Sequence, residues 1–451
     1  MAEETPGITE ISVAGFKSIE KGGIEIRPLT ILAGANSSGK SSIMQPMLLM
    51  KQTLDVSYDP GPLLLYGPHV QFTQYEQLLP KTHKRNRQNL IVGYEFAKDL
   101  RLSCKFQFIM DEEEHQRRIK LSNMTFSDID SEGKVTKIYP SMPVKKITEI
   151  IHEDIRESLE EIEERPGSRA KFKWQVKAER CFLDFALSRK VGGRNYSFPS
   201  PSPIELIVIK GAIEKLIHVP GLRGNPERTY HIASTQGSSF PGTFENYIAG
   251  LILRWQEEND ERLNWVGENL RLLGLTSQVS AKTIDDVNVE LHVGRLPVIQ
   301  DAGLQEDTVS IADVGFGVSQ VLPVLVALAV AQPGQMVYIE QPELHLHPRA
   351  QVALAEVLAD AANRGVRVVV ETHSSLLLLS VMTKIARDKI DSDKVKLHWF
   401  ERNNETGKTK ISSRNPDESG SYGDWPQDFA DVELDAHGGY LDAVAEREFE
   451  V

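Results

Sequence analysis

Hydrophobic residues form short uninterrupted runs near both ends of the chain, and these runs predict buried parallel strands. Residues 29–33, 336–339 and 366–370 are mostly apolar and rich in β-branched side chains. Strands covered by helices on both faces read as continuous apolar runs of this length. Residues 8–13 and 24–26 predict two further strands ahead of the first run. Together the two ends of the chain predict one α/β core.

The middle of the chain follows other periods. Residues 90–140 alternate apolar and polar positions, which predicts an antiparallel meander. Residues 144–162 carry apolar side chains at helical spacing up to Pro166, and the basic segment 169–187 is expected to add a second helix, giving a helical hairpin. The Gly-, Ser- and Pro-rich residues 192–203 are interpreted as a linker. The core is therefore predicted to be split by a central insertion.

Further helices are predicted at residues 204–217 and 244–273 and directly after Pro348. Another helix is expected at residues 41–54, where Pro46 lacks a backbone N–H and its ring clashes with the preceding turn. Since this costs about 3 kcal/mol or more inside a helix, we expect a kink or an early break there.

The charge balance limits the possible partners. The sequence contains 51 Lys and Arg against 64 Asp and Glu, a formal net charge of −13 in 451 residues. This excludes a surface that wraps nucleic acid on all sides, while a local basic groove remains compatible with it. Cys104 and Cys181 are too few for a disulfide framework. Because the N-terminal residues lack a basic start with an apolar core, and no apolar run has bilayer length, we expect a cytoplasmic protein without membrane contact.

Residues 34–41 match the phosphate-binding pattern G-x-x-x-x-G-K-[ST], directly after the apolar run 29–33. Glycines allow successive backbone N–H groups to face phosphate oxygens, Lys40 can neutralise the terminal phosphates, and the Ser41 hydroxyl can bind Mg²⁺. The sequence therefore predicts that the chain binds ATP with Mg²⁺. The candidate nucleotide-binding residues of this loop are Gly34, Asn36, Ser37, Ser38, Gly39, Lys40, Ser41 and Ser42.

A glycine-containing turn at residues 313–320 precedes a second long apolar run. A glycine turn that opens a helix presents free backbone N–H groups and the positive end of the helix dipole. Gly315, Gly317 and Ser319 are therefore candidates to contact a γ-phosphate. By itself the pattern is more typical of an ordinary helix cap, and that interpretation stays open.

The strand predicted at 337–339 ends in Glu340, and Glu343 follows in the next turn. Carboxylates at a strand tip beside a phosphate loop can hold Mg²⁺ and orient a nucleophilic water. We therefore expect Ser41 and Glu340 to be the metal-binding residues.

Histidines follow the same strand and the next one. His345 and His347 allow a metal-site interpretation, but no Cys or third His lies at ligand spacing, and a polar turn after the strand is the favoured explanation. The strand predicted at 366–370 ends in a polar segment that includes His373. This imidazole can donate a hydrogen bond to a γ-phosphate.

The order of these motifs resembles the ABC-type ATPase heads of the SMC, RecF and OLD (overcoming lysogenization defect) group. The resemblance rests on residues 15–18 (Gly-Phe-Lys-Ser), the phosphate loop, the turn at 315–320, the segment 340–348 and Thr372-His373. It is strongest to the compact prokaryotic OLD-like AAA ATPases associated with phage defence, which share a segment similar to residues 220–223. The implied fold class is an α/β P-loop NTPase, an ABC-type ATPase head split by a central β-rich and helical insertion.

The resemblance also implies an arrangement of subunits and a set of catalytic residues. Two heads would meet face to face, with each ATP held between Lys40 of one subunit and the turn 315–319 of the other. The catalytic candidates are Glu340, Gln341, Glu343 and His373. Such heads usually have Asp-Glu where this chain has Glu340-Gln341, and a neutral amide cannot accept a proton. Glu343 is therefore the candidate replacement base, and slow hydrolysis is expected.

The functional hypothesis is an ATP-hydrolysing dimeric head that regulates a separate effector, a nuclease, in prokaryotic defence. The alternatives are an ATP-gated scaffold that hardly hydrolyses ATP and a RecF-like DNA repair ATPase. Basic residues at 81–87 and along 169–180 could contact DNA phosphates locally. The expected segments are 1–80 (first half of the head), 81–203 (β lobe and helical hairpin), 204–300 (connecting segment), 301–390 (second half of the head) and 391–451 (hairpin and acidic tail).

Overall fold

The computed structural model describes most of the chain. The described residues are 6–80, 89–97, 99–111, 116–128, 135–151, 157, 172–191, 194–199, 202–233, 237–276, 278–295, 307–423 and 438–442. Within these ranges the strands form four sheets, and a parallel sheet and an antiparallel sheet of six strands each make up the core.

The parallel sheet joins strands from the two ends of the chain, in the order β11-β16-β17-β3-β18-β19. Only the last pair, β18 and β19, is antiparallel. The apolar runs predicted as buried strands are confirmed, because β3, β16 and β17 lie side by side in its centre. The strands are β3 (Leu29–Gly34), β11 (Ile217–Val219), β16 (Met336–Glu340), β17 (Arg367–Glu371), β18 (Val395–Arg402) and β19 (Thr409–Arg414).

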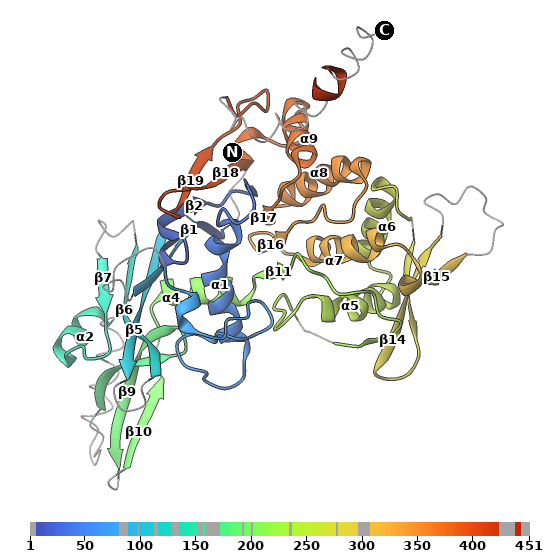
Figure 1. The fold of residues 1–451 in the computed structure, drawn as a ribbon. Coiled ribbons are helices and arrows are strands. Elements are labelled where there is room, and N and C mark those ends of the chain that lie inside the picture. Colours follow the sequence, from blue (N-terminus) through green and yellow to red (C-terminus); the bar gives the residue numbers. More distant parts are fainter. Residues whose placement is uncertain are drawn as a thin grey trace.

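Both faces of this sheet are buried, as its continuous apolar strands require. Val368 and Val370 belong to one core cluster and Val369 to the other, so successive side chains point to opposite faces. Figure 1 shows α7, α8 and α9 gathered beside β16 and β17, with α5 and α6 close to α7. These helices are α5 (Glu245–Glu257), α6 (Glu261–Leu272), α7 (Phe316–Val330), α8 (Pro348–Asn363) and α9 (Ser375–Ala386).

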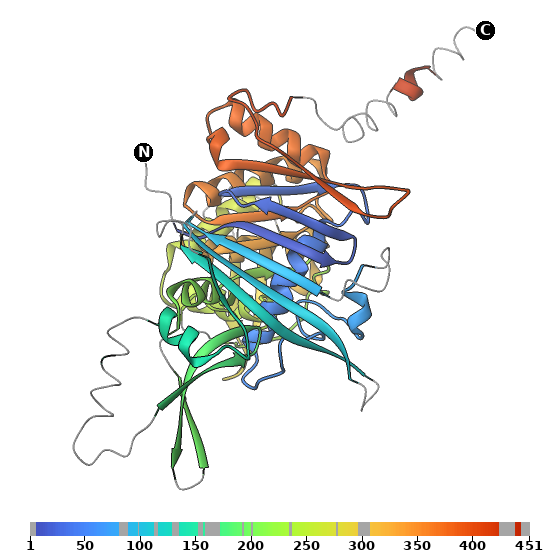
Figure 2. The ribbon, with the colours of Figure 1, turned by 90° about the vertical axis from the view of Figure 1, so that its left-hand side faces the viewer.

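Helix α1 (Lys40–Asp55) covers the other face and contacts β1 of the antiparallel sheet. That sheet has the order β2-β1-β4-β5-β6-β7, which confirms the predicted meander. Figure 2 shows it as a broad layer in front of the helices. Its strands are β1 (Ile8–Phe16), β2 (Ile19–Glu25), β4 (Asn89–Phe96), β5 (Leu100–Asp111), β6 (Gln116–Asp128) and β7 (Val135–Ile138).

A small sheet lies beside α5, as Figure 1 shows for β14 and β15. It consists of β12 (Tyr230–His231), β13 (Val279–Thr283), β14 (Asn288–Gly294) and β15 (Thr308–Ser310). The helices predicted near 204 and between 244 and 273 are confirmed as α4 (Ile204–Glu214) and as the pair α5 and α6. No helix in the described part of the chain has both the length and the apolar character needed to cross a bilayer.

The predicted second helix of the hairpin is wrong. Residues 172–191 and 194–199 form an antiparallel sheet of β8 (Phe172–Glu179), β9 (Phe182–Val191) and β10 (Arg194–Pro199), which projects from the body in Figure 2. Trp174 and Val176 are buried on one face and Lys173 and Lys177 are exposed on the other, a strand period of two. For the same reason the linker predicted at 192–203 is partly wrong, because it contains β10.

Two other helix predictions also need correction. The first helix of the hairpin is described only as α2 (Val144–Ile150), and most of the predicted remainder lies outside the described residues. The early break predicted at Pro46 does not occur, because α1 continues through it to Asp55. Pro46 is buried within α1, and we infer that packing on both sides of the helix offsets the missing hydrogen bond.

Candidate functional site

The phosphate loop connects the end of β3 to the start of α1. Gly34 has φ +142° and Gly39 has φ +107°, values that L side chains rarely adopt. A Cβ on Gly34 would also lie 2.2 Å from the backbone oxygen of Phe400 in β18. The Lys40 amine donates to the carbonyls of Gly34 at 3.1 Å and Ala35 at 2.8 Å. The loop thus closes around its own lysine, and only glycine fits at its first position.

Ser41, in the first turn of α1, donates its hydroxyl to Oε1 of Glu371 at 2.9 Å. The Tyr338 hydroxyl donates to the other oxygen, Oε2, at 2.9 Å. Burial, together with the negative charge of Glu340, raises the pKa of Glu371 above its ordinary 4.5, although the bonds from Ser41 and Tyr338 act against this shift. Glu371, not Glu340, is therefore the carboxylate that contacts the phosphate-loop serine.

Glu340 lies directly beside Glu371, because the two are register partners on β16 and β17. Its carboxylate faces β11, where it receives bonds from His218 Nε2 at 3.3 Å and from the Gly221 amide at 3.1 Å. Burial alone would raise the pKa of Glu340, but the contacts with His218 and Gly221 lower it overall. Glu340 is thus held as a carboxylate in the wall behind the phosphate loop.

Glu343 and His373 contact each other. Oε1 of Glu343 accepts from the backbone amide of His373 at 2.9 Å, while Oε2 is buried without a hydrogen-bond partner. Burial, followed by the charge of Lys40, lowers the pKa of His373 below its ordinary 6.5. The backbone of Gly34 acts in the opposite direction. The shift favours the neutral ring, which carries one N–H donor.

Lys40, Gln341 and His373 line one open pocket of about 610 Å³. Gln341 has φ +44°, and its backbone N–H donates to the backbone oxygen of Glu371 at 2.7 Å. Glu340 and Glu343 are not among the residues that line this pocket. The predicted residues that line it are Asn36, Ser37, Gly39, Lys40, Ser41, Ser42, Gln341 and His373, and the unpredicted ones are Lys17, Ser18, Gln45, Gln77, Leu79, Glu371, Arg402 and Gly407.

The hairpin of β18 and β19 braces the phosphate loop from outside. Thr409 donates its hydroxyl to the backbone oxygen of Ser38 at 2.7 Å and lies 2.7 Å from the Ser18 hydroxyl. Its backbone amide donates to the Ser18 carbonyl at 2.9 Å. Lys17, next in sequence, donates to Gln45 at 2.6 Å. Lys17 and Ser18 therefore line the pocket, a position that the sequence alone did not reveal.

The glycine turn at 315–319 lies elsewhere. Gly315 is the N-cap of α7, without a side-chain cap, and Phe316 beside it is 52% exposed. Ser319 donates to the Phe316 carbonyl at 3.1 Å and lines a second cavity. None of Gly315, Gly317 and Ser319 is among the residues that line the pocket around Lys40. A single chain therefore does not bring the two predicted halves of the nucleotide site together in one pocket.

The residues of the first pocket fit a magnesium-bound triphosphate. The N-cap of α1, Gly39, has no side-chain cap, and the buried Ser38 hydroxyl has no hydrogen-bond partner. Free donors at a helix start, next to a lysine, are typical of a phosphate site. Ser41 and Glu371 supply the oxygen ligands that Mg²⁺ prefers, and Mg²⁺ needs only one or two protein ligands beside phosphate and water.

The alternative metal reading of His345 and His347 gains no support. The His347 ring accepts from the Arg349 amide at 3.3 Å as the N-cap of α8, and the His345 ring lies 5.8 Å from that of Phe316. Among the residues that the structure describes, no group of three or more His, Cys, Asp or Glu side chains could hold a metal ion. Both histidines have local roles in the turn.

Two known families match the chain. "AAA ATPase domain" matches residues 7–179, which contain the phosphate loop, and "AAA domain, putative AbiEii toxin, Type IV TA system" matches residues 240–380, which contain the other three motifs. No curated protein matches the sequence. Together with the phosphate loop, the two matches identify an ATP-binding ATPase and confirm the P-loop α/β fold class.

Solved structures of SMC heads resemble the fold, each at 12% identity. An SMC head bound to the C-winged helix domain of ScpA has a TM-score of 0.44 and covers 91% of this chain and 98% of its own. The SMC head domain from Thermotoga maritima has a TM-score of 0.35, with 90% and 98% covered. A Pyrococcus furiosus head with an extended coiled coil, bound to the C-terminal domain of ScpA, has a TM-score of 0.41, with 91% and 96% covered.

Proposed function

We propose that the chain is a dimerising ATPase head that closes around two ATP molecules and thereby controls a separate effector protein. The observation that carries this proposal is the separation of Lys40 and Ser319 into different pockets. The pocket around Lys40 and the start of α7 at Ser319 both offer donors to a phosphate. Because they lie apart in one chain, a single ATP would contact both only if it lay between two copies of the chain. The expected effector is a nuclease in prokaryotic defence, in line with the resemblance to OLD-like ATPases.

Five residues of the first pocket would have defined parts in ATP hydrolysis. Lys40 and the first-turn amides of α1 would hold the β- and γ-phosphates. Ser41 and Glu371 would hold Mg²⁺, which neutralises charge on the phosphate oxygens. His373, neutral because of its lowered pKa, would donate to the γ-phosphate. Gln341 can orient a water but cannot take its proton, so hydrolysis would be slow.

Single-turnover hydrolysis tests the enzymatic part of this proposal. Wild-type protein should hydrolyse ATP measurably faster than the Lys40→Ala variant, because that variant loses the charge that holds the phosphates. Glu343→Gln tests the candidate base, and Gln341→Glu should raise the rate about 10- to 100-fold if a carboxylate at that position restores general-base catalysis. Sedimentation with and without ATP measures dimerisation in the same samples.

A second candidate function is an ATP-gated scaffold, and Gln341 favours it. This side chain lines the pocket where a catalytic carboxylate is expected, while Glu343 is engaged with His373. A scaffold would dimerise with ATP, yet its hydrolysis rate would equal that of Lys40→Ala and Glu343→Gln. Equal rates together with ATP-dependent dimerisation would replace the enzyme proposal by this one.

Contact with DNA, as in a RecF-like role, remains a separate proposal. Lys173 and Lys177 lie exposed on the same face of β8, while residues 81–87 and 169–171 lie outside the described residues. Phosphate contacts from these lysines would make binding fall steeply with salt. Fluorescence anisotropy of labelled DNA from 50 to 200 mM salt, with a Lys173→Ala and Lys177→Ala double variant, measures this contribution.

Co-purification of the chain with its partners identifies the effector, and self-association alone would contradict an effector role.

A further inference from the structure

Arg223 follows β11 in the chain and is 7% exposed. Its guanidinium donates to backbone carbonyls in separate parts of the fold. Nη1 donates to Gln320 O at 2.8 Å, and Nη2 donates to Glu340 O at 2.7 Å and Gln341 O at 3.2 Å. Nε donates to the nearby Pro220 O at 3.0 Å. One side chain therefore joins the beginning of α7 to the turn that follows β16.

Gln320 reinforces this connection from the side of α7. Its side-chain amide donates to the backbone oxygens of Arg223 at 3.2 Å and Gly224 at 3.4 Å. Gln320 follows Ser319, the residue expected to contact the nucleotide of a partner subunit. Gln341, at the other end of the connection, lines the phosphate pocket. These hydrogen bonds thus connect both halves of the proposed composite site.

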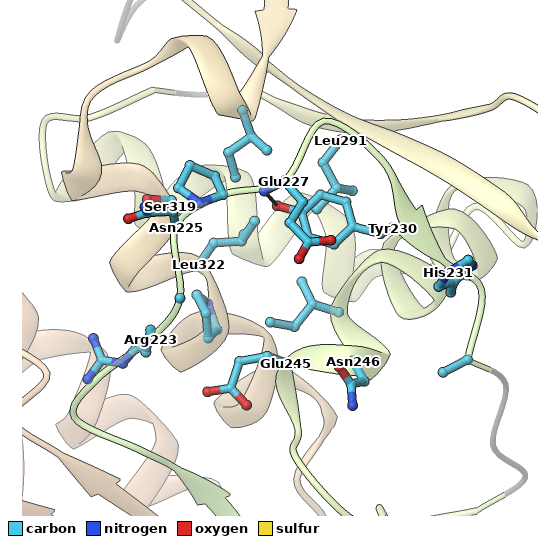
Figure 3. A pocket seen from close by; sticks show the side chains of 16 residues that line it. Arg223, Asn225, Glu227, Tyr230, His231, Glu245, Asn246, Leu291, Ser319 and Leu322 are labelled. Atoms are coloured by element: carbon cyan, nitrogen blue, oxygen red, sulfur yellow. Dashed lines mark hydrogen bonds between the residues drawn. The ribbon is translucent and has the colours of Figure 1, made fainter.

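On another side, the same part of α7 borders an open cavity of about 560 Å³. Figure 3 shows Ser319, Leu322 and Arg223 on one side of it and Tyr230 and His231 on the other. Packing density in protein interiors normally fixes the position of a helix. Although α7 also packs against α5 and α6, the hydrogen bonds of Arg223 and Gln320 connect the part of α7 beside this cavity directly to the turn after β16.

The charge of Arg223 adds to the connection. Burial lowers the pKa of this guanidinium to about 10, and the charges of Glu245, Glu343 and Glu340 act in the opposite direction. Arg223 is therefore charged at neutral pH. A planar guanidinium can donate to several carbonyls at fixed angles at once, which the single ammonium of lysine cannot reproduce.

We propose that Arg223 is a positioning residue that transmits the engagement of the α7 N-terminus by a partner's ATP to the Gln341 turn in its own phosphate pocket. This inference rests on the proposed dimeric function. The chain would then hydrolyse its own ATP only after its α7 has contacted the nucleotide of the other subunit, because the two contacts share one rigid connection.

A double-mutant cycle tests this proposal through the single-turnover hydrolysis rate. Ser319→Ala and Arg223→Lys should each lower the rate about tenfold, and the double variant should be no slower than Arg223→Lys alone, because both changes interrupt one path. The dissociation constant of ATP for the monomer should stay within about twofold for both, since neither residue lines the phosphate pocket. Rate losses that multiply to about 100-fold would show two independent effects and overturn the proposal.

Two further variants control for general loosening of α7. Gln320→Ala removes the hydrogen bonds from the Gln320 side chain to the backbone of Arg223 and Gly224. It should show the same non-additivity with Ser319→Ala, even if Arg223→Lys does not fold. Arg364 donates to Leu328 O at 2.9 Å, at the opposite end of α7. Arg364→Lys should therefore combine with Ser319→Ala multiplicatively, and non-additivity there would contradict a specific path.

The outcomes also separate this inference from the proposed function. If sedimentation shows no ATP-dependent dimer of the wild type, both are overturned. If the dimer forms and hydrolyses ATP while the losses for Arg223→Lys and Ser319→Ala multiply, the dimeric function stands and only the role of Arg223 is lost.

Discussion

The beginnings of α1 and α7 use the same physical device in two different settings. Each helix has a glycine N-cap without a side-chain cap, Gly39 and Gly315, and therefore presents free backbone donors and a positive dipole end. Around the start of α1 the chain adds a lysine, a buried carboxylate and a neutral histidine. Around the start of α7 it leaves Phe316 half exposed.

The comparison shows that one chain can carry a complete phosphate-binding site at one helix start and only part of such a site at another. The α1 end has its charges and its brace within one chain, so it should bind ATP as a monomer. The α7 end lacks a lysine in comparable contact among the described residues, and its donors should contribute only when a second copy supplies the phosphates. Substitutions at matched positions can sharpen or break this contrast.

The largest difference is expected between alanine substitutions of two glycines. A Cβ on Gly34 would lie 2.2 Å from Phe400 O at a φ of +142°, whereas a Cβ on Gly315 would meet nothing within 4 Å. Gly34→Ala should lower the free energy of unfolding by about 3 kcal/mol through strain and steric clash. Gly315→Ala should change it by less than about 0.5 kcal/mol. Urea denaturation measures both, and equal losses would break the comparison.

The next largest effect concerns binding. Lys40→Ala should weaken ATP binding by the monomer about 100-fold, because two charge-assisted phosphate contacts are lost. Ser319→Ala should leave monomer binding unchanged and weaken only ATP-dependent dimerisation, roughly fivefold for one hydroxyl contact. Calorimetry with Mg-ATP and sedimentation separate the two quantities. If Ser319→Ala lowers the affinity of the monomer for ATP, the starts of α1 and α7 contact the same nucleotide within one chain, which contradicts the comparison.

The smallest effect is a pH dependence of stability. Because the pKa of Glu371 is raised in the folded chain, its contribution to stability is full below 4.5, the ordinary value, and is lost as the pH rises through the folded-state pKa. Without nucleotide, Glu371→Gln should therefore gain stability over wild type as the pH rises from 5 to 8. Urea denaturation at several pH values measures the difference.

Glu356 is the matched control for this experiment. Its pKa is lowered, chiefly by a hydrogen bond from Lys384 on the surface. A lowered pKa contributes stability above the ordinary 4.5 and loses it only as the pH falls below that value, so Glu356→Gln should show almost no change relative to wild type between pH 5 and 8, and solvent screening keeps any effect small. A parallel trend for both variants would show that the shift at Glu371 does not arise from its burial in the pocket.

The parts of the site that could be predicted from sequence are those carried by local motifs. The loop around Lys40 and the strand tips at Gln341 and His373 lie where the apolar runs indicated, because buried parallel strands end at one edge of the sheet. The helix start at Gly315 also followed from its own residues. These features depend on neighbours in sequence, which a single sequence displays.

The remaining parts depend on pairing between distant strands. Glu371 contacts Ser41 because β17 lies between β16 and β3, and no local pattern distinguishes it from Glu340. Arg402 and Gly407 reach the pocket only through the hairpin of β18 and β19. The segment 169–187 was predicted as a helix because of its many charged residues. The alternation of Phe172, Trp174 and Val176 with polar residues in that segment indicates a strand and was overlooked.

The brace that Thr409 forms on the phosphate loop has a consequence for how the protein is made. The loop follows β3 and lies within the first 41 residues, while the two sheet neighbours of β3, β17 and β18, begin at Arg367 and Val395. A nascent chain on the ribosome therefore carries the loop through most of translation without the strands that hold its shape. We infer that the loop takes its final shape, and with it the ability to bind nucleotide, only after the hairpin of β18 and β19 has emerged.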